Sequence, residues 1–519
     1  MSGAGPHSHS PANPFPTSNN PRDDLPTDNP SPDFPIPAIH ATPDFPSTMS
    51  VAFQLAPRAS AAFRRGTLSL ERTTPSSTTL HTSLASPGLF LYSRRLLIPH
   101  LTPDTYTDLV SPAAPVVDLA TEQIVSNLPA SYPSTIRQFA SLHSQFSLFS
   151  LRDAAMSAAV AQVDNKAVVH GPDFVHARTH RGLTKISAAE WADLVAKWMP
   201  DMALVPAQVH LPGAVVGKKA AERSVVRSLA YLDAVRSQAP KDVPLWATVA
   251  GFRTVDVEQA AKGVAERVQS QTADQALISG IVVDAPTLSD LSPASPHLPA
   301  DLPRYAPSLL TPDAMVRHIG SIDFFPSTMA FIFSSAGYAL NLSLDKLDAS
   351  ANGIKFLMTR DLYAKDYSPL QAECQCWACK NHNAAYVYHL LDCHEMLGWT
   401  LLTIHNLHQL STLFASIRAS IDLDPVDTTR AKLDAWLAYY TEHVVPEQTR
   451  ILESNGLFEH AAASAKAAET AEAHVPKIKK DKKRPRSAAF EQDKDGKEAE
   501  AGQGEQEQER AAKRVRKDQ

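Results

Sequence analysis

The middle of the chain, roughly residues 52–460, alternates short apolar runs with segments whose apolar residues recur every three or four positions. The short runs predict buried strands, and the periodic segments predict helices that bury one face. Strands are predicted most clearly at 202–205, 245–251 and 278–284. Helices are predicted at 187–198, around a stripe from Ala221 to Leu232, and at about 256–269. Repeated units of this kind favour parallel strands with helices outside the sheet.

Capping residues mark two of the expected helix starts. Ser187 and Glu190 are spaced as a capping box, and Ile186 and Trp191 are placed as its hydrophobic staple. Thr311 and Pro312 suit the N-cap and first position of a later helix, which Gly320 should close. Over about 300 residues such βα units favour an α/β fold of the (β/α)8 TIM-barrel type. An open doubly wound sheet is the alternative, but no glycine-rich dinucleotide motif supports it.

The two ends of the chain differ in composition from this middle part. Residues 1–50 contain 12 of the 40 prolines and few large apolar residues, so a disordered tail is expected there. Residues 461–519 carry 15 basic and 12 acidic residues without a leucine, and they should also be unfolded. Basic clusters at 479–486 and 513–517 suit a nuclear address or an RNA contact, or simply a solvated tail.

Charge and hydropathy argue against a protein that binds nucleic acid on its own and against a membrane-spanning protein. The net charge is −6, and without the basic C-terminal tail the remaining chain is near −9, which is unfavourable for binding nucleic acid without a partner. Charges interrupt every apolar stretch before about 18 residues, so no transmembrane segment is expected.

The strongest chemical signal is a cluster of three of the four cysteines, Cys374, Cys376 and Cys379. Three thiolates within six residues can bind one tetrahedral metal ion. The spacing alone leaves the fourth ligand open, and the downstream candidates are His382, His389, Cys393, His394, His405 and His408. Four protein ligands would leave no open position for a substrate, so the metal should be structural.

Several motifs in order resemble the queuine tRNA-ribosyltransferase family. They are the Cys-x-Cys-x2-Cys run at 374–379, the Tyr-x-x-His-Leu stretch from Tyr386, the pair His405-Asn406, the segment Pro303-Arg304-Tyr305 and the stretch 321–325. The resemblance implies a TIM barrel with a zinc subdomain near its end and one structural Zn²⁺ per subunit. It also implies that His405 completes the site with Cys374, Cys376 and Cys379.

With this resemblance the chain divides into four expected parts. Residues 1–50 are a disordered proline-rich tail, and 52–365 form the barrel body. Residues 366–460 hold the zinc-binding subdomain and closing helices, and 461–519 are a disordered charged tail.

The residues that resemble the family's catalytic segments lack its acids. Catalytic members exchange a guanine base at the tRNA wobble position and use two carboxylates, one as nucleophile and one as proton shuttle. The position of the nucleophile is occupied by Pro326, and the family's Asp-Ser-Gly-Gly-Phe-Gln motif has no counterpart in 127–153. Asp323 is the nearest surviving acid, but in the family that residue lies beside the nucleophile.

No catalytic or cofactor-binding residue is therefore expected, and the chain most resembles the non-catalytic accessory subunits of the eukaryotic enzyme. The resemblance implies a heterodimer with a catalytic subunit and tRNA binding through that complex. It also implies a cytoplasmic location, including peripheral association with the mitochondrial outer membrane. A zinc-dependent tRNA-binding or scaffold protein without a transglycosylase partner is the alternative function.

The segment after the cysteines is expected to contribute to the subunit interface. It is rich in large apolar side chains, which interface cores favour. The residues expected to take part are Tyr386, Tyr388, Leu391, Met396, Trp399 and Leu402.

Overall fold

A computed structural model describes most of the middle of the chain, within the unit Met1–Ala465. The described residues are 48–56, 63–73, 79–94, 96–110, 115–121, 136, 140, 142, 145–151, 174–179, 182–208, 217–284 and 294–454. Apart from residues 48–50, both predicted tails lie outside them, as does most of 127–153.

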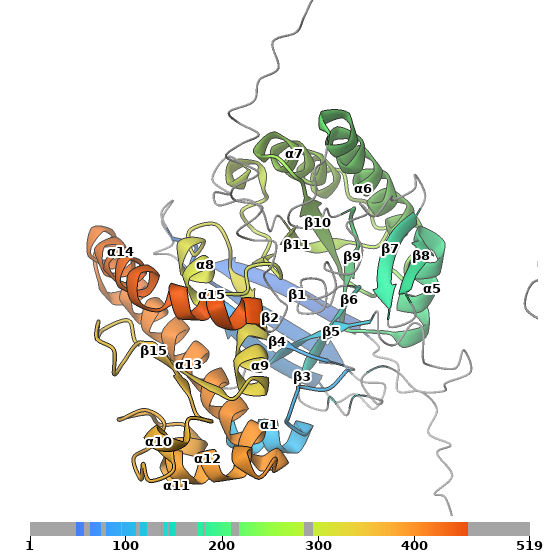
Figure 1. The fold of residues 1–519 in the computed structure, drawn as a ribbon. Helices are drawn as coiled ribbons and strands as arrows, with labels where there is room; N and C mark the ends of the chain where they lie inside the picture. The colour runs from blue at the N-terminus through green and yellow to red at the C-terminus, as the bar shows by residue number, and fades with distance from the viewer. Residues whose placement is uncertain are drawn as a thin grey trace, which may run out of the picture. The chain divides into compact units, whose positions relative to one another are not determined.

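Eight parallel strands close into a barrel, so the predicted (β/α)8 fold is confirmed and the open sheet is excluded (Figure 1). In barrel order the strands are β4 (Gly88–Tyr92), β5 (Val116–Ala120), β6 (Phe146–Ser150), β9 (Met202–Val205), β10 (Leu245–Ala250), β11 (Ile278–Asp284), β12 (Arg304–Tyr305) and β13 (Phe324–Pro326). β13 pairs with β4 and closes the ring. The three strands predicted most clearly are β9, β10 and β11.

Aromatic side chains fill the inside of the barrel. Phe90 stacks on Phe324 with ring centroids 4.9 Å apart and meets Trp246 edge-on at 5.7 Å. All three side chains are fully buried, as is Tyr305 beside them. Packing of this kind makes the barrel a filled core and leaves its two ends as the sites of variation.

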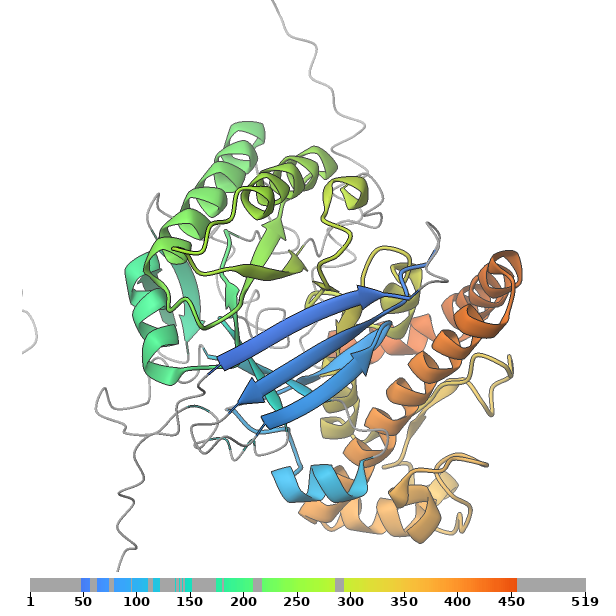
Figure 2. The same cartoon turned by 180° about the vertical axis from the view of Figure 1, so that it is seen from behind.

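A three-stranded antiparallel sheet covers one end of the barrel (Figure 2). It consists of β1 (Thr48–Leu55), β2 (Gly66–Thr73) and β3 (Thr79–Ala85). β3 ends only two residues before β4 begins, so the sheet lies at the amino-terminal end of the barrel strands. The β2 side chains Leu68 and Leu70 join the buried cluster inside the barrel, and Arg72 forms a buried ion pair with Asp201 at 3.0 Å.

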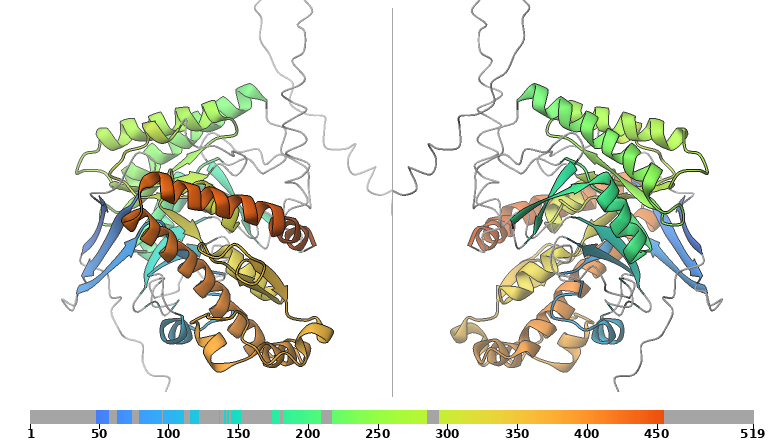
Figure 3. Two further views of the ribbon diagram at one scale, coloured as in Figure 1. Left: turned by 90° about the vertical axis from the view of Figure 1, so that its left-hand side faces the viewer. Right: turned by 90° about the vertical axis from the view of Figure 1, so that its right-hand side faces the viewer.

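The helices between β8 and β11 follow the predicted capping and periodicity. They are α5 (Ala188–Trp198), α6 (Lys218–Gln238) and α7 (Thr254–Gln269), and Figure 3 shows α6 and α7 side by side. Both halves of the capping box are present, because Glu190 N donates to Ser187 Oγ and Ser187 N donates to Glu190 Oε2. The strand β8 (Gly182–Ser187) that precedes α5 pairs only with β7 (Phe174–Thr179), outside the barrel.

The helix predicted from Thr311 is α8 (Pro312–Arg317), and it starts where expected but ends before Gly320. The prediction of the end was wrong because the chain turns at His318. Its amide bonds to Met315 three residues back, and its carbonyl accepts from Ser321 and Ile322.

The chain after the barrel forms the region that holds the cysteines. Its elements are α9 (Thr328–Ser335), β14 (Tyr338–Asn341), β15 (Gly353–Phe356), α10 (Arg360–Tyr363), α11 (Trp377–Asn381), α12 (Ala384–Asp392), α13 (Met396–Leu423), α14 (Val426–His443) and α15 (Val445–Ser454). The remaining described elements are α1 (Pro103–Leu109) and a short 3-10 helix, η1 (Ser295–His297). α13 packs against α9, β14 and β4, so this one helix joins the cysteine region to the barrel.

None of the described helices combines the length and apolar character that crossing a membrane would require. The predicted division at residues 365 and 366 stays a prediction, because α13 packs on elements from both sides of it.

Candidate metal centre and barrel mouth

The three clustered cysteines and His405 come from two elements that the fold brings together. Cys376 is the N-cap of α11, where its sulfur accepts a hydrogen bond from the Cys379 amide at 3.2 Å. Cys379 lies within that short helix, and Cys374 precedes it. His405 lies in α13 and is completely buried. The cap fixes the turn that points two sulfurs toward the same histidine.

The geometry of these four groups fits a tetrahedral metal site. The sulfurs of Cys374, Cys376 and Cys379 lie 3.7, 3.6 and 3.3 Å from His405 Nδ1. All four ligand atoms lie within 4.8 Å of one another. Zinc–sulfur bonds of about 2.3 Å and zinc–nitrogen bonds of about 2.0 Å at a tetrahedral angle place S and N about 3.5 Å apart. The donor set and spacing are therefore consistent with zinc.

The strand β14 orients the histidine for this role. His405 Nε2 lies 2.8 Å from the Leu340 carbonyl oxygen, so it carries the proton and donates, leaving the Nδ1 lone pair to face the sulfurs. Asn406 Oδ1 accepts from the Leu340 amide at 2.8 Å. Gln409, one turn later, donates to the Cys374 sulfur at 3.3 Å and accepts from Leu342 N. Side chains of α13 that bind β14 and the residue directly after it thus support the four candidate ligands.

The shifted pKa values of these cysteines and of His405 indicate that the cluster favours a bound cation. Hydrogen bonds with Cys376 and Cys379 lower the pKa of the Cys374 thiol, whereas contacts with Cys374 and Cys379 raise the pKa of the Cys376 thiol. Burial lowers the pKa of His405, but the neighbouring cysteines outweigh it and raise the value to about 9. A bound divalent cation would compete with protons for these sulfur and nitrogen atoms.

The other candidates are not part of this group of four, although His408 interacts with the Cys374 side chain. Among the described residues, the metal-ligating cluster comprises only Cys374, Cys376, Cys379 and His405. His382 stacks on Tyr386, and His389 lies beside the exposed Cys393. Of the six candidates left open by spacing, the fold brings His405 to the three sulfurs.

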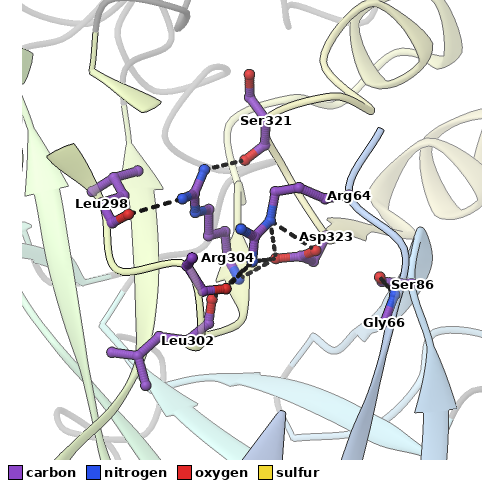
Figure 4. A network of polar contacts seen from close by, with 9 residues as sticks. Arg64, Gly66, Ser86, Leu298, Leu302, Arg304, Ser321 and Asp323 are labelled. Carbon is purple, nitrogen blue, oxygen red and sulfur yellow. Dashed lines mark hydrogen bonds and ion pairs between the residues drawn. The ribbon is translucent and has the colours of Figure 1, made fainter. Parts of the chain in front are cut away.

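A second buried polar network surrounds Asp323, directly before β13 (Figure 4). The Arg64 guanidinium lies 3.0 Å from the Asp323 carboxylate, and the Arg304 amide donates to the same carboxylate at 2.9 Å. The Arg304 side chain reaches the carbonyls of Leu298 and Ser321. Burial raises the pKa of Asp323, while Arg64 and Arg304 oppose that shift. These contacts hold Asp323 at the amino-terminal end of the barrel, beside the covering sheet.

The opposite end of β13 carries no acid. Pro326 is its last residue and is buried. Ser327 follows it, donates its amide to the Phe90 carbonyl and accepts from the Tyr92 amide at 2.9 Å. The chain at this carboxyl-terminal end of β13, where barrel enzymes place their catalytic groups, is therefore bound to β4.

Comparison with known sequences decides the family. The sequence profile of queuine tRNA-ribosyltransferase matches residues 62–435, most of the chain. The chain belongs to the queuine tRNA-ribosyltransferase family.

Relatives within the family share a more specific name. A Drosophila virilis protein named queuine tRNA-ribosyltransferase accessory subunit 2 is 28% identical over 66% of this chain and 84% of its own length. Proteins of the same name from Gallus gallus and Trichoplax adhaerens are 25% and 27% identical, and the matches cover 89% and 92% of their lengths.

Two buried acids of the barrel strands were not singled out from the sequence. Asp118 is the central residue of β5, and its carboxylate accepts from the Tyr305 hydroxyl at 2.7 Å. Asp284 is the last residue of β11 and is also buried. For Asp284 the available signal was an acid at the carboxyl end of an apolar strand, in the run Val-Val-Asp-Ala.

The structure corrects the expectation that all six large apolar residues named after the cysteines are available to a subunit interface. Leu391 and Leu402 are completely buried, and Tyr388 is only 8% exposed, because α12 and α13 pack these side chains against each other and the barrel. Met396 is 82% exposed and Tyr386 37% exposed. The residues available to a partner in this segment are therefore fewer than predicted.

Proposed function

We propose that this chain is the non-catalytic accessory subunit of a heterodimeric queuine tRNA-ribosyltransferase, a tRNA-guanine transglycosylase complex. The complex exchanges guanine for queuine at the wobble position of tRNA, a step in queuosine modification. The observation that carries the proposal is Pro326 at the carboxyl end of β13, in a member of this family. The shared name of the relatives supports the accessory role.

The absence of catalysis follows from the chemistry of the site. A covalent base exchange needs a carboxylate that can attack the ribose, and proline has no side-chain oxygen. Asp323 cannot replace it, because its carboxylate is fully buried at the other end of β13 and engaged by Arg64. Asp118, in the middle of β5, binds the Tyr305 hydroxyl.

We assign one structural zinc per chain to Cys374, Cys376, Cys379 and His405. When bound, the ion would supply folding energy by joining α11 to α13, and a shell of four protein ligands would leave no position for a substrate. The role of the metal in this proposal is therefore to hold the region after the barrel on α13.

The proposal places the partner on the exposed part of the cysteine region. Met396, at the start of α13, and Tyr386, in α12, are the exposed ones among the six predicted interface residues. Met396→Glu should weaken pairing with the catalytic subunit and leave zinc content unchanged. Leu423→Glu is the matched control, because Leu423 is 78% exposed at the far end of the same helix.

The proposed location is the cytoplasm, including the outer surface of mitochondria, with peripheral rather than spanning attachment. Family resemblance alone motivates this location, and imaging of the tagged chain with a mitochondrial marker tests it. Signal confined to another compartment would contradict it.

Co-expression tests the proposed function as a whole. The tagged chain should co-purify with the catalytic subunit in equal amounts, and the pair should incorporate labelled guanine into tRNA. A chain that binds tRNA tightly alone and never captures the catalytic subunit would favour the alternative, a tRNA-binding or scaffold protein without a transglycosylase partner.

A further inference from the structure

One face of α6 carries a stripe of basic side chains, Lys219, Arg223 and Arg227, spaced four residues apart. Residues four apart lie on the same face of a helix, about 6 Å apart along its axis. Lys219 and Arg223 are exposed, and Arg227 is half-buried. We define these three residues as the α6 stripe.

The opposite face of α6 is the one that the protein uses for packing. Ala221, Val225, Leu232 and Val235 are buried against the rest of the barrel. The stripe therefore faces outward because the apolar pattern of the helix leaves it there.

The charges of two stripe residues, Lys219 and Arg223, are not neutralised by nearby acids in the described part of the chain. Lys219 and Arg223 form no ion pair there, and the Arg223 side chain donates to the Lys219 carbonyl at 3.0 Å. The nearest acid on the helix, Glu222, lies on the side toward α7, 3.7 Å from Arg253 and 4.0 Å from Lys218. A locally positive surface thus stands on a protein whose net charge is −6.

The stripe lies in the first half of α6, which follows the carboxyl end of β9. Gln208, three residues after the end of β9, donates its amide to Ser228 Oγ at 2.9 Å, so the chain that leaves β9 contacts the middle of α6. Because α6 runs back toward the start of β10, the stripe residues before Ser228 lie on the side of the carboxyl-terminal strand ends, where Asp284 ends β11.

We propose that the α6 stripe binds the phosphate backbone of the tRNA in the complex. This inference rests on the proposed function and assigns one surface of the chain to it. Lysine and arginine contacts to phosphates position a nucleic acid without reading its sequence, as an accessory subunit requires. Val226, an exposed apolar residue beside the stripe, offers neither a hydrogen bond nor a stacking surface for a base. The stripe therefore contributes affinity and orientation, and it does not select the base.

The test uses the full chain paired with the catalytic subunit and measures tRNA affinity over a range of salt concentrations. Lys219→Ala/Arg223→Ala should weaken binding several-fold at physiological ionic strength. Each lost phosphate contact lowers the slope of log affinity against log salt by about one, so the slope should fall by about two. Melting temperature and pairing should not change, because both side chains are exposed.

The matched control is Lys197→Ala/Lys241→Ala, which removes the same charge. Lys197 is in the last turn of α5 and Lys241 follows the end of α6, so both lie toward the other end of the barrel. The control complex should bind tRNA like the wild type. Equal affinity and an equal salt slope for the stripe variant and the wild type would overturn the inference.

Two further outcomes are distinguished in the same experiment. Failure of the wild-type chain to pair with the catalytic subunit overturns the proposed function, whereas intact pairing with unchanged tRNA affinity overturns only the stripe. Vesicles containing phosphatidylserine are the third probe. If the stripe variant lost vesicle binding and kept its tRNA affinity, the stripe would bind membranes and the inference would be wrong.

Discussion

The neighbours His405 and Asn406 bind the two backbone polar groups of a single residue, Leu340. His405 donates to its carbonyl, and Asn406 accepts from its amide. The histidine ring is therefore fixed by β14 before any metal binds. A substitution at the metal site should consequently disturb both the cysteine turn and the packing of α13 on β14.

Cys376→Ala should abolish metal binding, because it removes one ligand and the N-cap of α11 together. The zinc content should fall from one per chain to near zero, and the melting temperature should fall because structural zinc supplies folding energy. Elemental analysis and thermal melting measure the two effects. His382→Ala, His389→Ala, His394→Ala and Cys393→Ala are the controls and should keep the metal. Full zinc content in Cys376→Ala would refute the assigned ligand set.

Asp323→Ala should destabilise the fold by about 3–5 kcal/mol, because it leaves the buried Arg64 guanidinium without its partner. Chemical denaturation of the full chain measures the change. Replacing both partners, as in Arg64→Met/Asp323→Leu, should recover much of the loss, because neither member of the pair then leaves the other's charge uncompensated. Arg450→Ala, which breaks a surface pair with Glu447, should have little effect. A stable Asp323→Ala protein would show that the buried pair does not hold the covering sheet.

At the scale of elements, the pattern of apolar residues predicted the helices and strands that are long or clearly periodic. The strands β9, β10 and β11 are almost entirely buried and mostly apolar, and the helices α5, α6 and α7 have a clear buried face. The barrel strands β12 and β13 have only two and three residues. Strands that short show no periodicity in the sequence. They form because pairing with their neighbours closes the barrel.

The candidate metal site was also only partly predictable from the sequence. Three cysteines close together in the sequence predict a metal, whereas the fourth ligand lies 26 residues beyond Cys379, on another helix. Spacing left six candidates open, and only the packing of α13 against α11 selects His405. The exposure of Tyr388 was predicted wrongly for a related reason. Whether the Tyr388 side chain is exposed depends on how α12 packs on α13, and the sequence of this segment alone does not predict that packing.

At the scale of the whole molecule, the predicted tails should be dispensable, but the structure moves one boundary. β1 begins at Thr48, which pairs with Thr73, so a deletion of residues 1–50 would remove the first residues of a strand. Deleting 1–47 together with 462–519 should leave melting and pairing unchanged, because these segments are poor in apolar residues. Calorimetry and co-purification measure this. A truncated chain that no longer paired would place part of a tail in the interface.

The central claim is that this chain assists a transglycosylase and does not perform the exchange. The most direct measurement traps the covalent tRNA intermediate in the reconstituted pair and identifies the protein chain that carries it on a denaturing gel. The account predicts an adduct on the catalytic subunit alone, and none when this chain is incubated with tRNA by itself. An adduct on this chain would contradict the account. Its loss in Asp118→Asn or Asp284→Asn would then identify the nucleophile.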